Sequence, residues 1–540
     1  MSTRSKKSGG ARALRIGLLL AANVACVWFL WQWAATGGAS AQPTAEAERG
    51  GGVVAAAEPA QPRPLRTRDA DLEARVRACI AQGERSAVAL AQGRVRADQC
   101  TVSVHVREVG CSGELVAIGA DRAMRPASNM KLVTTAAALV LFGSQGAFQT
   151  IFESPAALQA GVLQGDLVAH AGGDPLYRRE NGGDAAELLA PVVAQLKAAG
   201  VTRIAGALVL DEGTFAPPSP GPAWPASNQH WQEFCALAGG FSANAGCLTA
   251  VVATTRNGAP AEVNLFPRGH GLATRIGVVT GAAKSKLDVR VGVAGGTARV
   301  EGSIPPEVPR FEARFAAPDP VLLFGGALLD ALERGGIQVD GGLLREQRRL
   351  EPGARVLAQL VTPLTSVLVP INTWSNNACA DQLFLTMGKR QFGQGTREAG
   401  GAATAHALER LGVDARGLVQ VDGSGLSRDN RITARQITAL VDAVLTGDPS
   451  AARAFRESLA VGGETGTLDK RLAALEGRVH AKTGFIAGTS ALSGFLNTVE
   501  GRTYAFSILV EYPNVEGLNK NCWKPMEDEI CAVLAADARG

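Results

Sequence analysis

The sequence predicts an α+β fold whose main body is interrupted by a β-rich insertion. Before residue 150, a helical segment and a β-hairpin precede a second, apolar helix. From residue 150 to 355, short β-rich runs alternate with Gly/Pro turns. After residue 361, helices dominate again and lead into three strand-like runs and a last helix. A helical body beside antiparallel strands is typical of a layered α+β domain, and here that domain is discontinuous.

The expected domain boundaries follow from the same changes along the chain. Residues 42–67 are rich in Ala, Pro, Gly and Glu without an apolar period, so we expect a flexible linker. The main body is expected to comprise residues 68–149 and 356–540, with residues 150–355 forming one or two inserted β-rich domains. At 540 residues the chain has room for roughly two to four domains.

Local patterns place the elements of each part. The first body segment is predicted to hold a helix at Asp69–Ile80, a hairpin of Thr101–Val106 with Leu115–Ala120, and a helix near Ser128. The insertion is predicted to hold helices Ala185–Ala199 and Val321–Arg334 and the strands Leu163–His170, Ile204–Leu210, Val251–Thr254, Ala261–Phe266, Leu287–Val293 and Ala298–Gly302. The second body segment is predicted to hold helices Leu364–Met387, Arg397–Leu411, Thr433–Thr446 and Ser450–Leu459, strands Val479–Lys482, Gly488–Leu496 and Arg502–Glu511, and helix Cys522–Ala536.

Residues 1–41 have the pattern of an export segment. Five cations precede the apolar run Ile16–Ala35, and Ala39-Ser40-Ala41 follows as a small-x-small cleavage site. The apolar run is long for a signal peptide and ends in a belt of tryptophans like that of a membrane anchor: Trp28, Trp31 and Trp33. We therefore expect export, to the periplasm after cleavage or to the outer face of the cytoplasmic membrane if the segment remains.

Charge excludes one class of partner. The formal net charge of +4 arises at the N-terminus, because residues 1–41 carry five Lys and Arg and no acid. Without these five cations the chain has a net charge of −1, so it lacks the basic surface that nucleic-acid binding requires. With 46% hydrophobic and 19% charged residues, the composition is that of a globular protein.

Cysteine and histidine spacing gives no sign of a metal site. The six histidines are scattered and no Cys-x-x-Cys occurs, so we expect neither a metal nor another cofactor. Beyond Cys26 there are eight cysteines, an even number that permits disulfides in an oxidising compartment. Among the 105 possible connectivities, Cys235 with Cys247 and Cys522 with Cys531 are plausible local pairs.

A serine and a lysine stand three residues apart where an apolar helix begins. Side chains at i and i+3 share a helix face, so Ser128 and Lys131 would be neighbours. The pair would supply a hydroxyl nucleophile, an amine to accept its proton, and helix N-terminal N–H groups for a developing oxyanion. Taken alone, the pattern is more typical of a helix cap beside a surface cation.

Two later motifs change that interpretation. Ser375-Asn376-Asn377 lies in the second body segment, and Lys482-Thr483-Gly484 ends a strand-like run. Ser-x-x-Lys, Ser-x-Asn and Lys-Thr-Gly form one set of acyl-transfer motifs, and they occur here in that order. Ser242-Ala243-Asn244 also matches Ser-x-Asn, but we favour Ser375 because it belongs to the same body as Lys482.

With these motifs, the chain resembles the serine penicillin-binding proteins. The long insertion resembles specifically the class C, low-molecular-mass D-alanyl-D-alanine carboxypeptidase/endopeptidase group, over roughly residues 68–535. Gly172-Gly173-Asp174-Pro175 and the segment Asp422–Arg428 are similar to segments of that group. The chain departs from the pattern at Phe485, where many relatives carry a small polar residue, and at the two cysteines in the insertion, Cys235 and Cys247.

The resemblance implies a fold and a reaction. The fold would be a transpeptidase domain like that of penicillin-binding proteins and serine β-lactamases, discontinuous, with β-rich inserted domains. Ser128 would attack the carbonyl of the penultimate D-Ala in a peptidoglycan stem peptide, with Lys131 as general base. Ser375 would relay a proton to the leaving amine, and water would then release the acyl-enzyme. The same attack on a cross-link would be D,D-endopeptidase action, and β-lactams would acylate Ser128.

The resemblance also implies how the substrate binds. Asn377 would bind the peptide amide, and Lys482 with Thr483 would hold the terminal carboxylate. Gly484 would allow close approach, and the backbone N–H groups of Ser128 and Phe485 would form the oxyanion hole. Lys482 is also the expected neighbour that lowers the pKa of Lys131.

Other interpretations remain open at this point. A serine β-lactamase would share the motifs but would need fast deacylation, and a compact lactamase has no room for the long insertion. An inactive exported cell-wall binding protein would keep the fold without acylation. For Asp422–Ser427 and for Asp174 we expect turn-forming roles rather than substrate contacts.

Overall fold

A six-stranded antiparallel sheet brings the two ends of the sequence together. The computed structural model describes residues 64–348 and 353–538. The strand order is β20-β21-β22-β23-β2-β4, with bounds Ala460–Val461, Val479–Ile486, Thr489–Asn497, Thr503–Glu511, Thr101–Glu108 and Val116–Ile118. β2 from the first body segment pairs with β23 from the second, from Thr101 opposite Glu511 to Glu108 opposite Tyr504. Short β1 (Leu65–Arg66) pairs with β3 (Ser112–Gly113), although the prediction had placed residues 65–66 in the linker.

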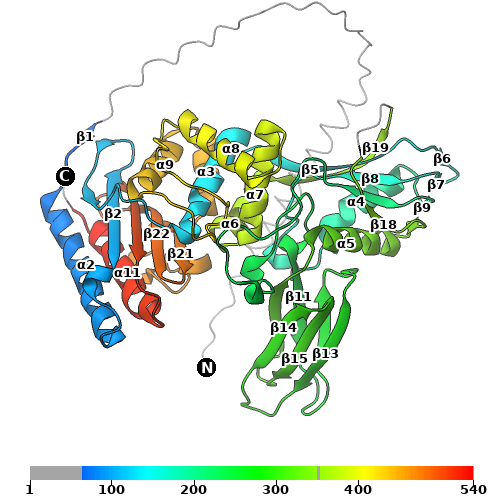
Figure 1. The fold of residues 1–540 in the computed structure, drawn as a ribbon, viewed down its shortest axis with the longest axis horizontal. Helices are drawn as coiled ribbons and strands as arrows, with labels where there is room; N and C mark the ends of the chain where they lie inside the picture. The colour runs from blue at the N-terminus through cyan, green and yellow to red at the C-terminus, as the bar shows by residue number, and fades with distance from the viewer. Residues whose placement is uncertain (1–63, 349–352, 539–540) are drawn as a thin grey trace, which may run out of the picture. The chain divides into compact units, whose positions relative to one another are not determined.

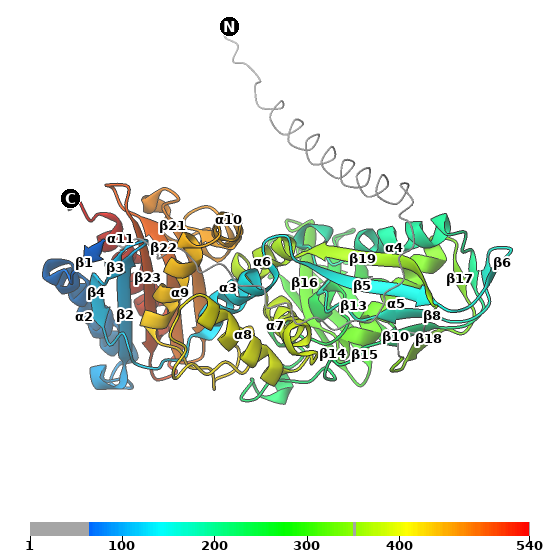
Figure 2. The same cartoon turned by 90° about the horizontal axis from the view of Figure 1, so that it is seen from above.

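Helices cover both faces of this sheet. Alternation along β23 sends Phe506 and Ile508 to one face and Ala505 and Leu509 to the other, because successive strand residues point in opposite directions. On the first face lie α2 (Ala70–Ala91) and α11 (Lys524–Ala535), and on the second lies α9 (Ala434–Thr446). Figure 2 shows β2, β22 and β23 between these two helical layers.

The helical body surrounds one central, apolar helix. α3 (Met130–Phe142) is apolar on all sides and buried along most of its length, as expected of a helix without a solvent face. Around it lie α6 (Leu364–Asn372), α7 (Asn377–Phe392), α8 (Arg397–Arg410), α9 and α10 (Pro449–Ser458). The prediction of one helix over Leu364–Met387 is wrong, because the chain breaks after Asn372 and α7 begins afresh with Asn376 as its N-cap.

The insertion begins with two sheets. A five-stranded sheet has the order β18-β10-β8-β5-β19, with bounds Leu343–Arg345, Leu208–Asp211, Leu167–His170, Ala147–Ser154 and Arg355–Pro363. β5 and β19 pair antiparallel and cross residues 150 and 355, so these strands join both sides of the predicted boundary. α4 (Ala186–Ala198) and α5 (Pro320–Arg334) pack with this sheet. A small sheet, β17-β9-β7-β6, comprises Gln338–Val339, Arg203–Ile204, Val162–Leu163 and Leu158–Gln159.

The rest of the insertion is two three-stranded sheets. One has the order β12-β11-β16 (Glu262–Phe266, Cys247–Ala253, Arg310–Ala316), and the other β13-β15-β14 (Ala273–Thr280, Thr297–Ile304, Asp288–Ala294). The sequence did not predict β13 and β16. Charged residues and glycine on their exposed positions, such as Arg275, Gly277 and Glu312, obscure the apolar alternation of these strands.

The predicted disulfides are wrong, since all eight cysteines of the described residues are free thiols. Cys522 and Cys531 lie nine residues apart in a continuous helical stretch, a rise of about 13 Å. Disulfide-linked Cα atoms lie no more than about 7 Å apart. Cys235 and Cys247 are both buried, which raises their thiol pKa values to about 11 and about 12 and leaves little reactive thiolate.

The described residues contain no helix that is long and apolar enough to cross a membrane. The predicted export segment, residues 1–41, and most of the predicted linker lie outside the described residues.

Candidate active site

A cleft of about 660 Å³ brings the first two motifs together beside the third. Ser128, Ser375 and Asn377 line it, and so does Phe485, which follows Lys482-Thr483-Gly484 in strand β21. The loop Gly425–Arg428 forms another part of its wall, and the insertion supplies the rest: Trp224, Pro225, Ala226, Gln229 and Phe234. The inserted segment is therefore part of the cleft and not only a separate module.

Ser128 lies in a single 3₁₀ turn, Ala127–Asn129, that leads into α3. The Ser128 side chain does not cap α3. The N-cap residue of α3 is Asn129, and no side chain makes a capping hydrogen bond there. The preceding Ala127 has φ +46°, a left-handed conformation that is strained for a residue with a Cβ atom. Gly425 packs so closely that a Cβ atom there would lie 1.8 Å from the Ala127 carbonyl oxygen. The neighbouring loop thus holds this strained turn in place.

Lys131 is fully buried beneath Ser128 with three hydrogen-bond acceptors around its ammonium group. Its Nζ donates to Ser128 Oγ at 3.1 Å, to Asn377 Oδ1 at 2.6 Å and to the Ser424 carbonyl oxygen at 2.6 Å. Burial lowers the pKa of Lys131 to about 8, while the carboxylates of Asp381 and Asp422 act in the opposite direction. A neutral amine 3.1 Å from a hydroxyl can accept its proton near neutral pH.

Lys482 is the second buried lysine of the site. Its Nζ donates to the Thr483 carbonyl oxygen at 2.9 Å. Burial lowers its pKa well below the ordinary lysine value, and the charge of Lys131 adds to this effect. We expected Lys482 to be what lowers the pKa of Lys131. That expectation is wrong: burial lowers the pKa of Lys131, and Lys482 does not contribute, whereas the charge of Lys131 does lower the pKa of Lys482.

Strand β21 forms the sheet side of the cleft and is tied to the Ser128 turn. Asn129 Nδ2 donates to the Lys482 carbonyl oxygen at 2.9 Å. A Cβ atom at Gly484 would lie 2.8 Å from the Pro126 carbonyl oxygen, so only glycine lets the strand approach this closely. Thr483 Oγ1 donates to Thr467 at 3.0 Å, and the Phe485 side chain is 57% exposed.

Ser375 and Asn377 stand where the predicted long helix breaks. Ser375 has φ +61° and faces the cleft, and no hydrogen bond of its hydroxyl is found among the described residues. Asn377 starts α7 and bridges two parts of the site. Its Oδ1 accepts from Lys131 and its Nδ2 donates to the Phe234 carbonyl oxygen at 2.8 Å. The alternative Ser242 and Asn244 are buried, and Asn244 bonds to Cys247 and Arg314 within the insertion.

Sequence reasoning missed Asp381, whose charge acts on Lys131 and whose carboxylate is linked to it through the backbone of Ser424. Asp381 Oδ1 accepts from the Ser424 N–H at 2.8 Å, and the carbonyl oxygen of that residue accepts from Lys131. Asp381 Oδ2 is buried without a hydrogen-bond partner. Burial first, and then the charge of Asp422, raise the pKa of Asp381 to about 7. Its position four residues after Asn377 on one helix face was the only sequence signal.

Asp422 and Asp174 form turns, as predicted, and Asp422 also bonds to the inserted segment. Asp422 accepts from the N–H groups of Gly425 and Ser427 at 2.8 and 2.7 Å, and from Trp224 Nε1 at 3.0 Å. The tight loop therefore also supplies the Ser424 carbonyl to Lys131 and anchors the inserted segment. Asp174 accepts from the Leu176 N–H at 2.8 Å, as a turn-former does.

Among the described residues, no group of three or more His, Cys, Asp or Glu side chains is arranged to hold a metal ion. The site offers a hydroxyl beside a deprotonatable amine, a second lysine, and backbone N–H donors.

Comparisons with known proteins show the family of the chain. Residues 85–530 match the D-Ala-D-Ala carboxypeptidase 3 (S13) family. The chain is 34% identical over 425 residues to the D-alanyl-D-alanine carboxypeptidase of Actinomadura sp. (strain R39), covering 75% of this chain and 77% of the relative. It is 26% identical over 392 residues to the D-alanyl-D-alanine carboxypeptidase DacB of Haemophilus influenzae, covering 71% and 79%.

The fold agrees as well. The crystal structure of penicillin binding protein 4 (dacB) from Haemophilus influenzae matches with a TM-score of 0.67 at 22% identity, over 83% of this chain and 99% of that one. The predicted fold class is thereby confirmed. The chain belongs to the D-Ala-D-Ala carboxypeptidase 3 (S13) family, and it is a serine-type D-Ala-D-Ala carboxypeptidase of the class C, low-molecular-mass penicillin-binding group.

Proposed function

We propose that the enzyme cleaves peptidoglycan stem peptides through an acyl-enzyme on Ser128. The observation that carries this proposal is the 3.1 Å contact between Ser128 Oγ and a buried Lys131 with a lowered pKa. Ser128 Oγ bonds to the carbonyl carbon of the penultimate D-Ala, and its proton passes to Lys131 Nζ. The C–N bond to the terminal D-Ala breaks, and the leaving amine takes a proton through Ser375. Lys131 supplies that proton and becomes neutral again. Water then attacks the ester and gives a proton to Lys131, which returns it to Ser128 Oγ as the ester C–O bond breaks.

The second part of the proposal concerns substrate binding. The N–H groups of Ser128 and Phe485 would stabilise the oxyanion, and the close approach of the strand at Gly484 to the Ser128 turn supports this pairing. Lys482 and Thr483 would bind the terminal carboxylate. Asn377 would act first as a positioning residue for Lys131, because both ends of its amide are already bonded within the protein. It binds the peptide amide only if the bond to Phe234 opens.

Endopeptidase action and β-lactam inhibition follow from the same chemistry. A D-alanyl cross-link places the same carbonyl at Ser128 with a larger leaving group, and a β-lactam places a strained amide there. The export pattern of residues 1–41 supports action in the periplasm or at the outer face of the membrane, where this substrate lies.

The test compares purified wild-type enzyme with Ser128→Ala on a D-Ala-D-Ala pentapeptide and on a cross-linked dimer. We expect wild type to release D-Ala and monomer, and Ser128→Ala to release neither. Fluorescent penicillin should label wild type at Ser128 with a persistent adduct. Release of neither product by wild type would show the proposal to be wrong, and rapid turnover of penicillin would favour a β-lactamase.

A further inference from the structure

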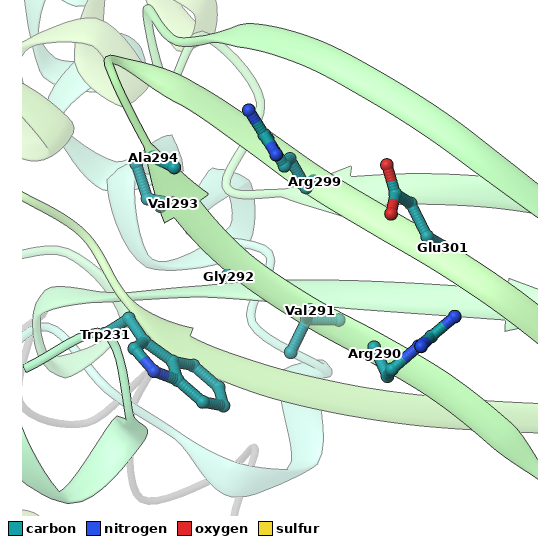
Figure 3. Close-up of a pocket in the computed structure, with 8 residues that line it drawn as sticks. All are labelled: Trp231, Arg290, Val291, Gly292, Val293, Ala294, Arg299 and Glu301. Atoms are coloured by element: carbon teal, nitrogen blue, oxygen red, sulfur yellow. The ribbon is translucent and has the colours of Figure 1, made fainter. Parts of the chain in front are cut away.

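A second pocket, of about 270 Å³, lies on the inserted module outside the catalytic cleft. Trp231 forms one side of it, and strands β14 and β15 form the other (Figure 3). The residues that line it are Arg290, Val291, Gly292, Val293, Ala294, Arg299 and Glu301. None of them has a role in the reaction described above.

The flat aromatic surface of the pocket is the Trp231 indole, and contacts with neighbouring strands fix its position. Gly292 lies opposite Arg299 in the β14–β15 register. A Cβ atom at Gly292 would be 3.8 Å from the Trp231 ring, so the indole lies directly against the glycine. The Trp231 carbonyl oxygen accepts from the Ala316 N–H at 2.8 Å, which fixes its backbone. The side chain is nevertheless 41% exposed, as a stacking surface for a ligand would be.

The charge of the pocket favours an anion. Glu301 is paired with Arg275 at 3.0 Å. Arg290 and Asp288 are 3.8 Å apart and both mostly exposed, so that pair is weak. Arg299, from the adjacent strand, has no ion-pair partner among the described residues. Two guanidinium groups therefore remain available for carboxylates, which arginine binds through two parallel hydrogen bonds.

The same chain segment lines both pockets. Gln229 and Phe234 face the catalytic cleft, and Trp231 between them faces the second pocket. Because consecutive residues advance at most about 3.6 Å, Trp231 and Gln229 have Cα atoms within about 7 Å of each other. A polymeric ligand that enters the cleft can thus reach the second pocket along one segment.

We propose that this Trp231 pocket is an accessory subsite for the peptidoglycan polymer. A sugar ring of the glycan strand would stack on the Trp231 indole, and a carboxylate of a neighbouring stem peptide would bind Arg290 and Arg299. The subsite would hold the polymer while one stem peptide occupies the cleft, and a short soluble peptide would not reach it. This inference rests on the proposed function for the identity of its ligand.

The first experiment measures binding without turnover. The double variant Trp231→Ala/Arg299→Ala is made in the full-length chain carrying Ser128→Ala, and sedimentation with purified insoluble peptidoglycan gives its affinity. We expect binding weaker than that of Ser128→Ala alone by about 30-fold or more, which is the combined effect of losing one charge-assisted contact and one stacking surface. Arg256→Ala is the matched control, because Arg256 is exposed on a loop of the same module outside the pocket. It should bind as the parent does.

The second experiment compares two substrates with the catalytic serine intact. The double variant should lose several-fold more kcat/KM on insoluble peptidoglycan than on a soluble pentapeptide, and equal melting temperatures would exclude misfolding. Unchanged binding to peptidoglycan, or equal losses on both substrates, would overturn the inference. If wild type does not hydrolyse the pentapeptide, the proposed function fails, but the binding experiment still decides whether this pocket holds the polymer.

Discussion

The two walls of the catalytic cleft each bury a lysine but surround its charge differently. On the helical wall, Lys131 donates to three acceptors and lies near the carboxylates of Asp381 and Asp422. On the sheet wall, Lys482 donates to one carbonyl oxygen and is repelled by Lys131. Burial lowers both pKa values, to about 8 at Lys131 and well below the ordinary lysine value at Lys482, and anions oppose the effect of burial at Lys131 alone of the two.

On the proposed function, this difference separates the base, Lys131, from the anion-binding group, Lys482. Desolvation alone would make both amines neutral, so it cannot assign roles. Counter-charges keep Lys131 near the pKa at which it can accept and return a proton within one cycle. On the proposed function, a substrate carboxylate supplies to Lys482 the counter-charge that Asp381 and Asp422 supply to Lys131.

The largest expected effect comes from removing the base. Lys131→Ala should lower kcat/KM for D-Ala release about a thousandfold, because Ser128 loses its proton acceptor. Stopped assays on the pentapeptide measure this, and labelling with fluorescent penicillin should fall in parallel. Lys470→Ala, which changes an exposed lysine near β21, is the control. If Lys131→Ala is acylated as fast as wild type, Lys131 is not the base, and the proposed difference in role between the two lysines is wrong.

The next effect tests the sheet wall. Lys482→Met keeps much of the side-chain volume but removes the charge, so kcat/KM for a peptide with a free terminal carboxylate should fall about 10- to 100-fold. For the same peptide with a terminal amide, kcat/KM should fall much less, because a neutral amide forms no ion pair with Lys482. Parallel progress curves for the two peptides give the ratio. Equal losses would mean that Lys482 does not bind the carboxylate.

A smaller effect concerns the counter-charge of Lys131. Because only the neutral amine accepts a proton, kcat/KM should rise as pH rises through about 8. The Asp381 carboxylate stabilises the ammonium form, so Asp381→Asn should lower the pKa of Lys131 and move this rise to lower pH by about one unit. Asn can still accept from the Ser424 N–H. A pH profile measures the shift, with exposed Asp429→Asn as control. A rise at the same or higher pH would contradict the assignment.

The smallest effect is expected at Phe485. Its backbone N–H is the group proposed to act, and its side chain is 57% exposed, so Phe485→Ala should change kcat by less than about threefold. KM for bulky substrates should change more, because the side chain narrows the cleft. Steady-state kinetics on two peptides of different size measures both. A loss in kcat as large as that of Lys482→Met would assign the side chain a greater role.

Local signals predicted most elements of the main body, but they missed the strands β5, β13, β16 and β19 and several junctions. The periodicity of α8, α9 and α11 and the alternation of β21, β22 and β23 are carried by residues that are neighbours along the chain. The break at Ser375 was missed, because the apolar residues on both sides continue one helical pattern. That break presents Ser375 to the cleft and begins α7 at the residue that contacts Lys131. At this point the apolar periodicity predicts a continuous helix, but the tertiary structure of the site interrupts it.

The sequence by itself determined the order of the three motifs and predicted which residues are the nucleophile and the base, since each motif is a short run of residue types at fixed spacing. Only the tertiary structure decided how these groups behave. The pKa of Lys131 depends on burial and on Asp381 and Asp422, which lie 250 and 291 residues away in the chain. The cleft wall depends on Trp224 and Phe234 of the insertion. Desolvation and charge act through space, so spacing along the chain does not encode them.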